Sequence, residues 1–352
     1  MTSKKKILVA PLNWGLGHAT RCIPIINALK DFGFQPVIAS DGDALTLLQK
    51  EFPGLTAYTL PGYDIHYSQS GKLNFSLLLQ APKMLRVMAK ERKAVRRIHK
   101  TEHLSGIISD NRFGVHVKGI PSVYITHQIR VLSGSTTAIS SKIHSHIISK
   151  FDACWIPDQD NKLNLSGELS RSASSKAELK YIGILSRFEK KESEKKYSLL
   201  VVLSGPEPQR TLLEEKLIGQ LAHFDKKTLF VRGSFSKDIL ALDNPNIEVK
   251  NYLLSEELER ALMASELVLA RSGYSTLMDL ARLEKKAFFI PTPGQYEQHY
   301  LAKRCEELKI APFSSQENFE LKDLDRVQDY SGFNEAFESG LPAGLFDLFQ
   351  GK

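Results

Sequence analysis

The stretch ILVAPLNWGLGHATRCIPIINAL, from Ile7 to Leu29, joins a buried strand, a glycine turn and a helix in one segment. Its apolar run from Ile7 to Leu12 is typical of a strand that is covered on both faces, and a glycine-rich turn follows it. Similar short apolar runs alternate with amphipathic helical patterns along the whole chain. This alternation predicts α/β structure with parallel sheets between layers of helices.

The predicted strands of the first half share β-branched and apolar residues: Lys6–Leu12, Gln35–Ser40, Ala57–Leu60, Gly106–Asp110, Ser122–Thr126, Ala153–Ile156 and Lys180–Leu185. Those of the second half are Leu199–Leu203, Thr228–Arg232, Glu248–Tyr252, Leu267–Ala270 and Ala287–Pro291.

A charged segment divides these two halves. The sequence RFEKKESEKKYS, from Arg187 to Ser198, has no apolar periodicity and is predicted to be a linker. We therefore expect two doubly wound, Rossmann-like domains, residues 1–186 and 199–330, joined by the linker 187–198 and facing each other across a cleft. The tail, residues 331–352, is expected to pack back toward the first domain. Ligands of such sheets bind beyond the carboxyl ends of the strands, so each domain can hold one substrate.

Composition narrows the class of protein. The 352 residues suffice for two cores, and the net charge of +7 favours anionic ligands without choosing among them. The three cysteines are too few and too scattered to indicate a disulfide framework or a zinc site. No apolar run approaches the ~20 residues that span a bilayer, and the N-terminal run lacks the features of a secretion signal. We expect a cytoplasmic protein.

The N-terminal turn contains one titratable residue, His18, next to Gly15 and Gly17. A dinucleotide fingerprint would need a third glycine where Thr20 stands, which argues against NAD. At a helix start, the dipole favours a neutral imidazole, which can act as a base, although a histidine that merely caps or packs is an alternative. Asp110, at the end of a predicted strand, is expected either to orient His18 or to cap the next helix.

The stretch LVLARSGYSTLMDLARLEKKAFFIPTPGQYEQHYLAKR, from Leu267 to Arg304, predicts two loop-to-helix turns side by side. The first helix begins near Tyr274, so its N-terminus offers amides to an anion, and Thr276 and Asp279 share one face. A carboxylate there suits the two hydroxyls of a ribose, although an ordinary helix start is the alternative. The predicted donor-binding residues of these turns are Arg271, Ser272, Gly273, Thr276, Asp279, Gln295, Glu297 and Gln298.

Another turn follows the first strand of the second half. Its small residues include Gly205, and backbone amides there can hold a diphosphate, with Arg210 adding a charge-assisted bond. Two neighbouring prolines remove N–H donors and weaken this prediction.

These motifs resemble the donor site of two-domain (GT-B) glycosyltransferases, most closely the MurG-type N-acetylglucosaminyltransferases and their family 28 relatives. The resemblance rests on R-S-G-x-x-T-x-x-D-L, P-x-P-G and E-Q-H in the second half and on G-L-G-H-A-T-R in the first, where it is similar to bacterial and archaeal homologues. It implies that Asp279, a glutamate in most of the family, contacts the ribose, and that Glu297 and Gln298 contact the sugar. It also implies that His18 is the base, and that His127 and Gln128 in the segment ITHQ, with Gly15 and Gly17, lie on the acceptor side.

Metal and nucleic-acid sites are not expected. Asp41 and Asp43 have the D-x-D spacing but are better explained as a helix start, and no second acidic cluster completes a site. A basic stripe within residues 83–100, following the apolar Phe75–Leu79, predicts either a solvated helix face or contact with an anionic membrane. It lacks the interleaved aromatics typical of nucleic-acid binding.

Three functional hypotheses follow. The first is an inverting glycosyltransferase that moves a sugar from a UDP-sugar to a glycan or lipid-linked acceptor without a cofactor or metal, in the cytoplasm and in contact with the inner face of the membrane. The second is an enzyme like the UDP-N-acetylglucosamine 2-epimerases. The third is a non-catalytic subunit that binds a sugar nucleotide.

Overall fold

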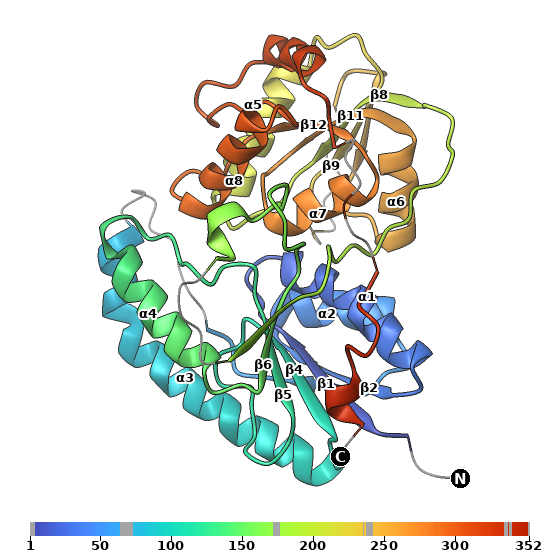
Figure 1. Ribbon diagram of the computed structural model, residues 1–352. Coiled ribbons are helices and arrows are strands. Elements are labelled where there is room, and N and C mark those ends of the chain that lie inside the picture. The colour runs from blue at the N-terminus through green and yellow to red at the C-terminus, as the bar shows by residue number, and fades with distance from the viewer. Residues whose placement is uncertain are drawn as a thin grey trace. The chain divides into compact units, whose positions relative to one another are not determined.

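A computed structural model describes residues 4–63, 73–171, 177–234, 236, 242–333, 337 and 340–350, with only the backbone of 73–81 and 135. The chain forms two compact units, the first comprising Met1–Leu185 and Glu338–Lys352 and the second Ser186–Phe337. Each unit is built around one parallel sheet (Figure 1). The predicted α/β class with two parallel-sheet domains is therefore confirmed.

The described part of the first unit contains a seven-stranded sheet in the order β3-β2-β1-β4-β5-β6-β7. Its strands are β1 (Lys6–Pro11), β2 (Gln35–Ser40), β3 (Ala57–Thr59), β4 (Gly106–Asp110), β5 (Ser122–Ile125), β6 (Ala153–Ile156) and β7 (Glu178–Tyr181). Its helices are α1 (Gly17–Asp31), α2 (Gly42–Glu51), α3 (Leu73–Glu102) and α4 (Thr137–Ile148), with short 3₁₀ turns η1 (Gly134–Thr136), η2 (Gly167–Leu169) and η4 (Asp347–Phe349).

The second unit contains, among its described residues, a five-stranded sheet in the order β10-β9-β8-β11-β12. The strands are β8 (Tyr197–Val202), β9 (Thr228–Val231), β10 (Ile247–Lys250), β11 (Ser265–Ala270) and β12 (Lys286–Phe289). The helices are α5 (Gln209–Leu221), α6 (Ser255–Met263), α7 (Tyr274–Arg282) and α8 (Tyr296–Glu307), followed by the 3₁₀ segment η3 (Leu321–Asp329).

The cores explain why apolar runs became strands. Every residue of β4, β5 and β6 is buried, because helices cover both faces of the sheet. On one flank, Val87 and Met88 of α3 and Ile147 and Ile148 of α4 join a single apolar cluster, and Figure 1 shows these two helices side by side. The sheet of the second unit has its own apolar cluster, to which α5 contributes Leu213, Leu217 and Leu221.

One predicted strand is displaced. The apolar run IGIL, residues 182–185, was expected within a strand from Lys180 to Leu185, but β7 ends at Tyr181. Ile182, Ile184 and Leu185 are nevertheless buried, so they fill the core from irregular backbone. An apolar run reports burial more directly than it reports strand geometry.

The segment that was predicted to be a linker has contacts in the second unit. Lys190 and Lys191 form ion pairs with Glu284 and Glu259, and Lys195 donates to the carbonyl oxygen of Met263. The boundary between the compact units falls before Ser186, and β8 already begins at Tyr197.

The C-terminal segment belongs to the first unit. Phe346 and Phe349 pack against Phe34 and Trp155, and Lys5 near the N-terminus donates to the carbonyl oxygen of Gln350. A Cβ at Gly106 would overlap the Phe349 ring, so glycine at this position of β4 makes room for the segment.

Candidate active site

The strand order of the first unit brings the loops after β1 and β4 together. The chain leaves β1 for β2 on one side and returns to β4 on the other, so the two loops separate at the carboxyl edge of the sheet. Such a switch point is where ligands bind in open α/β folds. His18 lies in the first turn of α1, directly beyond β1, and Asp110 is the last residue of β4.

The structure brings His18 and Asp110 into contact. The Nδ1 atom of His18 lies 2.9 Å from Oδ1 of Asp110. The Asp110 side chain is fully buried, whereas the His18 side chain keeps 16% of its area exposed. This arrangement is that of a histidine oriented by a buried carboxylate, with the ring still open to solvent.

A third residue, Arg21, completes the cluster. It lies three residues after His18 on α1, and it is buried. Its Nε and Nη2 donate to the two carboxylate oxygens of Asp110, with an Nε–Oδ2 distance of 2.5 Å. Its Nη1 lies 3.1 Å from Nδ1 of His127, which follows β5 and is also buried.

The electrostatics of the cluster favour a neutral base beside an ionised carboxylate. Burial alone would raise the pKa of Asp110, but the charges of Arg21 and His18 and their hydrogen bonds hold it well below its usual range. Burial lowers the pKa of His18; Asp110 opposes this effect, and Arg21 adds to it. A neutral imidazole near pH 7 can accept a proton.

The remaining residues predicted on this side have backbone roles. Gly15 has a φ of +75°, which glycine adopts without strain in the turn before α1. Gly17 begins α1, and its carbonyl oxygen accepts from the hydroxyl of Thr20. The backbone N–H of Gln128 donates to Oγ1 of Thr126, which shapes the loop after β5.

The second unit has its own switch point, between β8 and β11. Gly205 follows β8 with a φ of +106°, and Gly273 precedes α7. A Cβ at Gly205 would lie 3.4 Å from Oγ1 of Thr292, and one at Gly273 would lie 3.8 Å from Oγ1 of Thr276. These contacts place small residues and hydroxyl groups beside the N-terminus of α7, where backbone N–H groups attract anions.

Asp279 lies on α7 and accepts a hydrogen bond of 2.7 Å from the hydroxyl of Ser186. Burial raises its pKa to about 6, against the opposing effects of Arg187 and of the Ser186 hydrogen bond. A carboxyl group that titrates near neutrality can gain hydrogen bonds from ligand hydroxyls, which favour its ionised form.

Several predicted donor-binding residues are held by the protein itself. Arg210 pairs with Glu207 and Glu214, so its charge is already balanced within the protein. Arg271 is buried, and its Nη1 donates to the carbonyl oxygens of Ile290 and Pro291. Its Nη2 donates to the carbonyl oxygen of Gln209 and to Oε1 of Gln316.

The second loop-to-helix turn is also internally braced. The Ser272 hydroxyl donates to the carbonyl oxygen of Gln298, while the Gln298 side-chain oxygen accepts from the backbone N–H of Thr292 at 2.8 Å. Gln295 precedes α8, and Glu297 lies in the first turn of α8. These bonds fix the loop after β12 against the loop after β11.

Two residues were missed by the sequence analysis. Arg21 carried a signal, because its i, i+3 spacing from His18 puts both side chains on one helix face. The Oγ1 atom of Thr292 is buried and has no hydrogen-bond partner among the described residues, although it borders Gly205. A threonine between two prolines gave no comparable pattern.

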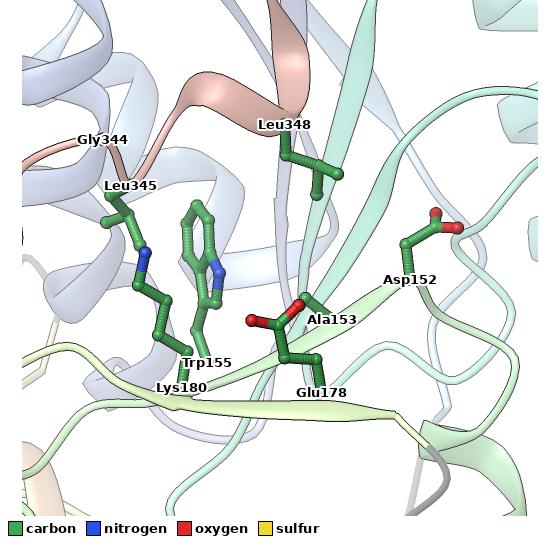
Figure 2. A pocket seen from close by; sticks show the side chains of 8 residues that line it. All are labelled: Asp152, Ala153, Trp155, Glu178, Lys180, Gly344, Leu345 and Leu348. Carbon is green, nitrogen blue, oxygen red and sulfur yellow. The ribbon is translucent and has the colours of Figure 1, made fainter. Parts of the chain in front are cut away.

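The hollow shown in Figure 2 lies elsewhere. Its volume is about 220 Å³, and it opens at the amino ends of β6 and β7, opposite the switch point of the first unit. The Trp155 indole, Lys180 and Glu178 line it together with Leu345 and Leu348 of the C-terminal segment. None of the predicted site residues borders it. Within the described ranges, no cluster of three or more histidine, cysteine or acidic side chains is arranged to hold a metal.

Comparison with known proteins identifies the type of enzyme. Residues 209–329 match the glycosyltransferase family 28 C-terminal domain. An uncharacterised glycosyltransferase of Methanopyrus kandleri is 22% identical over 298 residues, which cover 78% of this chain and 82% of that protein.

Solved structures share the fold. The glycosyltransferase SnogD from Streptomyces nogalater superimposes with a TM-score of 0.64 at 15% identity, over 92% of this chain and 91% of SnogD. MurG from Acinetobacter baumannii gives a TM-score of 0.55 at 14% identity, over 94% and 93% of the two chains. Together with the family match and the curated relative, these likenesses support a glycosyltransferase with the GT-B fold.

Proposed function

We propose that this chain is an inverting glycosyltransferase that moves a sugar, N-acetylglucosamine or a similar hexose, from a UDP-sugar to an acceptor hydroxyl in the synthesis of a cell-envelope glycan or glycolipid. The observation that carries this proposal is the contact of 2.9 Å between His18 and Asp110 at the switch point of the first unit. The family 28 match in the second unit supports a nucleotide-sugar donor.

In the proposed reaction, Nε2 of His18 removes the proton of the acceptor hydroxyl. The acceptor oxygen attacks the anomeric carbon while the bond from that carbon to the diphosphate breaks, so the configuration inverts and UDP leaves with the electron pair. Asp110 stabilises the imidazolium that forms. The lowered pKa of His18 keeps the base neutral before the reaction.

The donor side would rely on neutral donors and one carboxylate. The N–H groups at the start of α7, together with the Thr292 hydroxyl beside Gly205, suit the charge of the diphosphate. Asp279 would accept from the ribose hydroxyls. Because the Gln298 oxygen already accepts from Thr292, the Gln298 amide nitrogen would be its contact with the sugar, next to Glu297. We expect no metal requirement.

The test begins with nucleotide choice and then turns to the base. Among UDP, GDP, CDP and dTDP, UDP should raise the melting temperature most in a thermal-shift assay. With UDP-N-acetylglucosamine and no acceptor, the enzyme should slowly hydrolyse the donor, with water in place of the acceptor hydroxyl, and release UDP. His18→Ala should lower that release by roughly 10²–10⁴ and keep UDP affinity, because a general base acts in the transition state.

His146→Ala is the matched control, since His146 lies exposed on α4 of the same unit. Turnover of His18→Ala at the wild-type rate would remove His18 from the mechanism. Conversion of the donor to its manno epimer would favour the epimerase, and binding without turnover would favour a non-catalytic subunit.

We propose further that the flank formed by α3 and α4 contacts anionic lipid. The basic stripe is exposed: it consists of Lys83, Arg86, Lys90, Lys93, Arg97 and Lys100. Exposed aliphatic side chains accompany it, with Leu85 on α3 63% exposed and Ile139 and Ile143 on α4 more than half exposed. Exposed basic and apolar groups on two neighbouring helices suit a headgroup region.

The side chains of Phe75–Leu79, which precede the stripe, lie outside the described residues. Within the part of the chain that is described, no helix has the length and apolar character to cross a bilayer. The proposed contact therefore involves the stripe and the exposed aliphatic residues of α3 and α4.

The lipid contact is tested by sedimentation with phosphatidylglycerol and phosphatidylcholine vesicles. The protein should pellet with the anionic vesicles at low salt and be released as salt screens the headgroups. Replacing three stripe residues by glutamine should release it at unchanged UDP affinity: Lys90, Lys93 and Arg97. The control removes the same charge from exposed lysines of the second unit: Lys226, Lys227 and Lys303. Wild-type protein that stays in the supernatant would refute the contact.

A further inference from the structure

The Arg21 side chain lies between two histidines and one carboxylate. Its Nη2 is 2.9 Å from Nδ1 of His18 and also contacts Oδ1 of Asp110, while its Nη1 is 3.1 Å from Nδ1 of His127. Both histidines therefore turn the same ring nitrogen toward the same guanidinium. Arginine only donates, so its contact fixes where the proton of His127 lies. Nδ1 of His18 has a second partner, Oδ1 of Asp110 at 2.9 Å, so the tautomer of this ring depends on the carboxylate.

The hydrogen bonds of Asp110 decide the tautomer of His18. A carboxylate offers about four acceptor positions. Three lie within reach of other donors, namely Nε and Nη2 of Arg21 and the Sγ of Cys22 at 3.7 Å. A proton on Nδ1 of His18 fills the fourth. The opposite tautomer would leave Oδ1 one donor short in a fully buried position, which carries a desolvation cost.

The tautomer of His127 follows from its own contact with Arg21. The Nη1 group can only donate, so Nδ1 of His127 must accept with its lone pair. A neutral His127 then carries its proton on Nε2. With Nη2 of Arg21 donating to Oδ1 of Asp110 and Nδ1 of His18 donating to the same carboxylate, the lone pair of His18 lies on Nε2, whereas the proton of His127 lies on its Nε2.

We propose that Arg21 is a positioning residue that holds Asp110 against His18 and donates to His127. The resulting opposite tautomers make His18 the base and His127 a hydrogen-bond donor that never takes the acceptor's proton. The roles of His18 as base and His127 as donor rest on the proposed function. The tautomers themselves follow from the contacts alone. The His18–Asp110 pair is then part of a larger cluster, in which Arg21 contacts both histidines and each histidine has a different role.

The charge of Arg21 also favours the neutral form of His18. The groups that face His18 are Asp110 from β4, Arg21 from its own helix and His127 from the loop after β5. Burial lowers the pKa of His18 most, Asp110 opposes it, and Arg21 lowers it further. Removal of the guanidinium would leave Asp110 unopposed, so the pKa of His18 would rise.

The first test needs no substrate, and it uses variants only to assign the signals. Long-range ¹H–¹⁵N spectra of histidine-labelled wild-type protein distinguish protonated from unprotonated ring nitrogens, and His18→Gln and His127→Gln assign the two rings. The expected result for the neutral rings is a proton on Nδ1 of His18 and on Nε2 of His127. The same tautomer on both rings, or a proton on Nε2 of His18, would overturn the proposal.

The second test separates positioning from structural support. Arg21→Met should raise the pKa of His18 by about one unit or more, while Arg21→Lys, which keeps the charge, should leave it nearer the wild-type value. A purely structural arginine would change stability in both variants and the pKa of His18 in neither. If Arg21→Met does not fold, the comparison of Arg21→Lys with the wild-type tautomers still decides the question.

The third test uses activity and is read against UDP binding. UDP release by Arg21→Lys should fall by roughly tenfold, less than the loss of the base itself, with UDP affinity unchanged. His127→Gln keeps a donor at the position of Nε2 and should lose less turnover than His127→Ala, whereas His18→Gln should lose as much as His18→Ala. Tautomers as expected with no UDP binding in the wild type would refute the proposed function and leave the tautomer assignment standing. UDP binding and turnover in the wild type together with tautomers other than those expected would refute the role of Arg21 and leave the proposed function standing.

Discussion

Asp279 is expected to destabilise the second unit at neutral pH. Burial raises its pKa from 3.8 to about 6, against the smaller opposing effects of Arg187 and Ser186. A carboxyl group whose folded-state pKa lies above its unfolded value binds protons more tightly in the folded state. Its favourable contribution is therefore complete below about pH 4 and is lost as the pH rises through about 6.

The size of the effect follows from the pKa values. A rise from 3.8 to about 6 corresponds to almost 3 kcal/mol of unfolding free energy at neutral pH. The side chain is only half-buried, so solvent screening reduces this value, and we expect about 2 kcal/mol. For a domain of this size, about 2 kcal/mol shifts Tm by roughly 4–8 °C.

The perturbation is Asp279→Asn, which keeps an oxygen to accept from Ser186 but cannot ionise. Calorimetry should show a Tm above the wild type by roughly 4–8 °C at about pH 8, and a much smaller difference at about pH 4. Asp243→Asn, at an exposed position of the same unit, is the matched control and should change Tm little at either pH. An equal gain at both pH values, or no gain at pH 8, would refute the electrostatic argument.

The same variant tests the ribose contact. Loss of the charged acceptor should weaken UDP binding by about 1.5–3 kcal/mol in titration calorimetry. Wild-type affinity should rise as the pH increases through about 6, because the ribose hydroxyls donate to the ionised form. If the stability change appears while the UDP affinity stays within about twofold of the wild type, Asp279 is a strained carboxylate that does not bind ribose.

Two further predictions concern the first unit. Gly106→Ala should lower the unfolding free energy by about 1–3 kcal/mol and expose the C-terminal segment to proteolysis, because its Cβ overlaps the Phe349 ring; Gly54→Ala, where a Cβ meets nothing within 4 Å, should do neither. Asp110→Asn should cost about 3–5 kcal/mol by leaving the buried Arg21 without its carboxylate, and denaturant titrations should lose the acid dependence that the wild type shows below about pH 4. A variant with unchanged acid dependence would show that Asp110 does not carry this contribution.

The fold was predictable from the sequence because parallel strands are buried on both faces. Runs such as KILVAP in β1 and GIISD in β4 read directly as strands, and their alternation with helices fixed the class. The segment 182–185 shows the limit, because its apolar residues are buried without being part of a strand. Local pattern reports burial, and only long-range pairing determines which buried segments extend a sheet.

Site residues could be predicted from the sequence where they follow strands that lie next to each other in the sheet. His18 and Asp110 follow β1 and β4, and parallel pairing of those strands brings their ends together. Partner choice was not predictable for the arginines. Arg210 and Arg271 looked available for a diphosphate, but in the fold one pairs with Glu207 and Glu214 and the other supports backbone carbonyl groups.

The two switch points differ in chemistry in a way that suits the two halves of a transfer reaction. The first gathers titratable groups, with a histidine, a carboxylate and an arginine in mutual contact, as proton removal requires. The second offers a glycine turn, a helix N-terminus and the hydroxyl of Thr292, which has no hydrogen-bond partner in the described part of the chain, while Arg210 and Arg271 already pair with protein groups. Under the proposed function, the charge of the departing diphosphate must therefore be balanced by N–H and O–H donors. Substitution of Thr292 by valine, which keeps its shape, should consequently impair the transfer step more than substitution of Arg210.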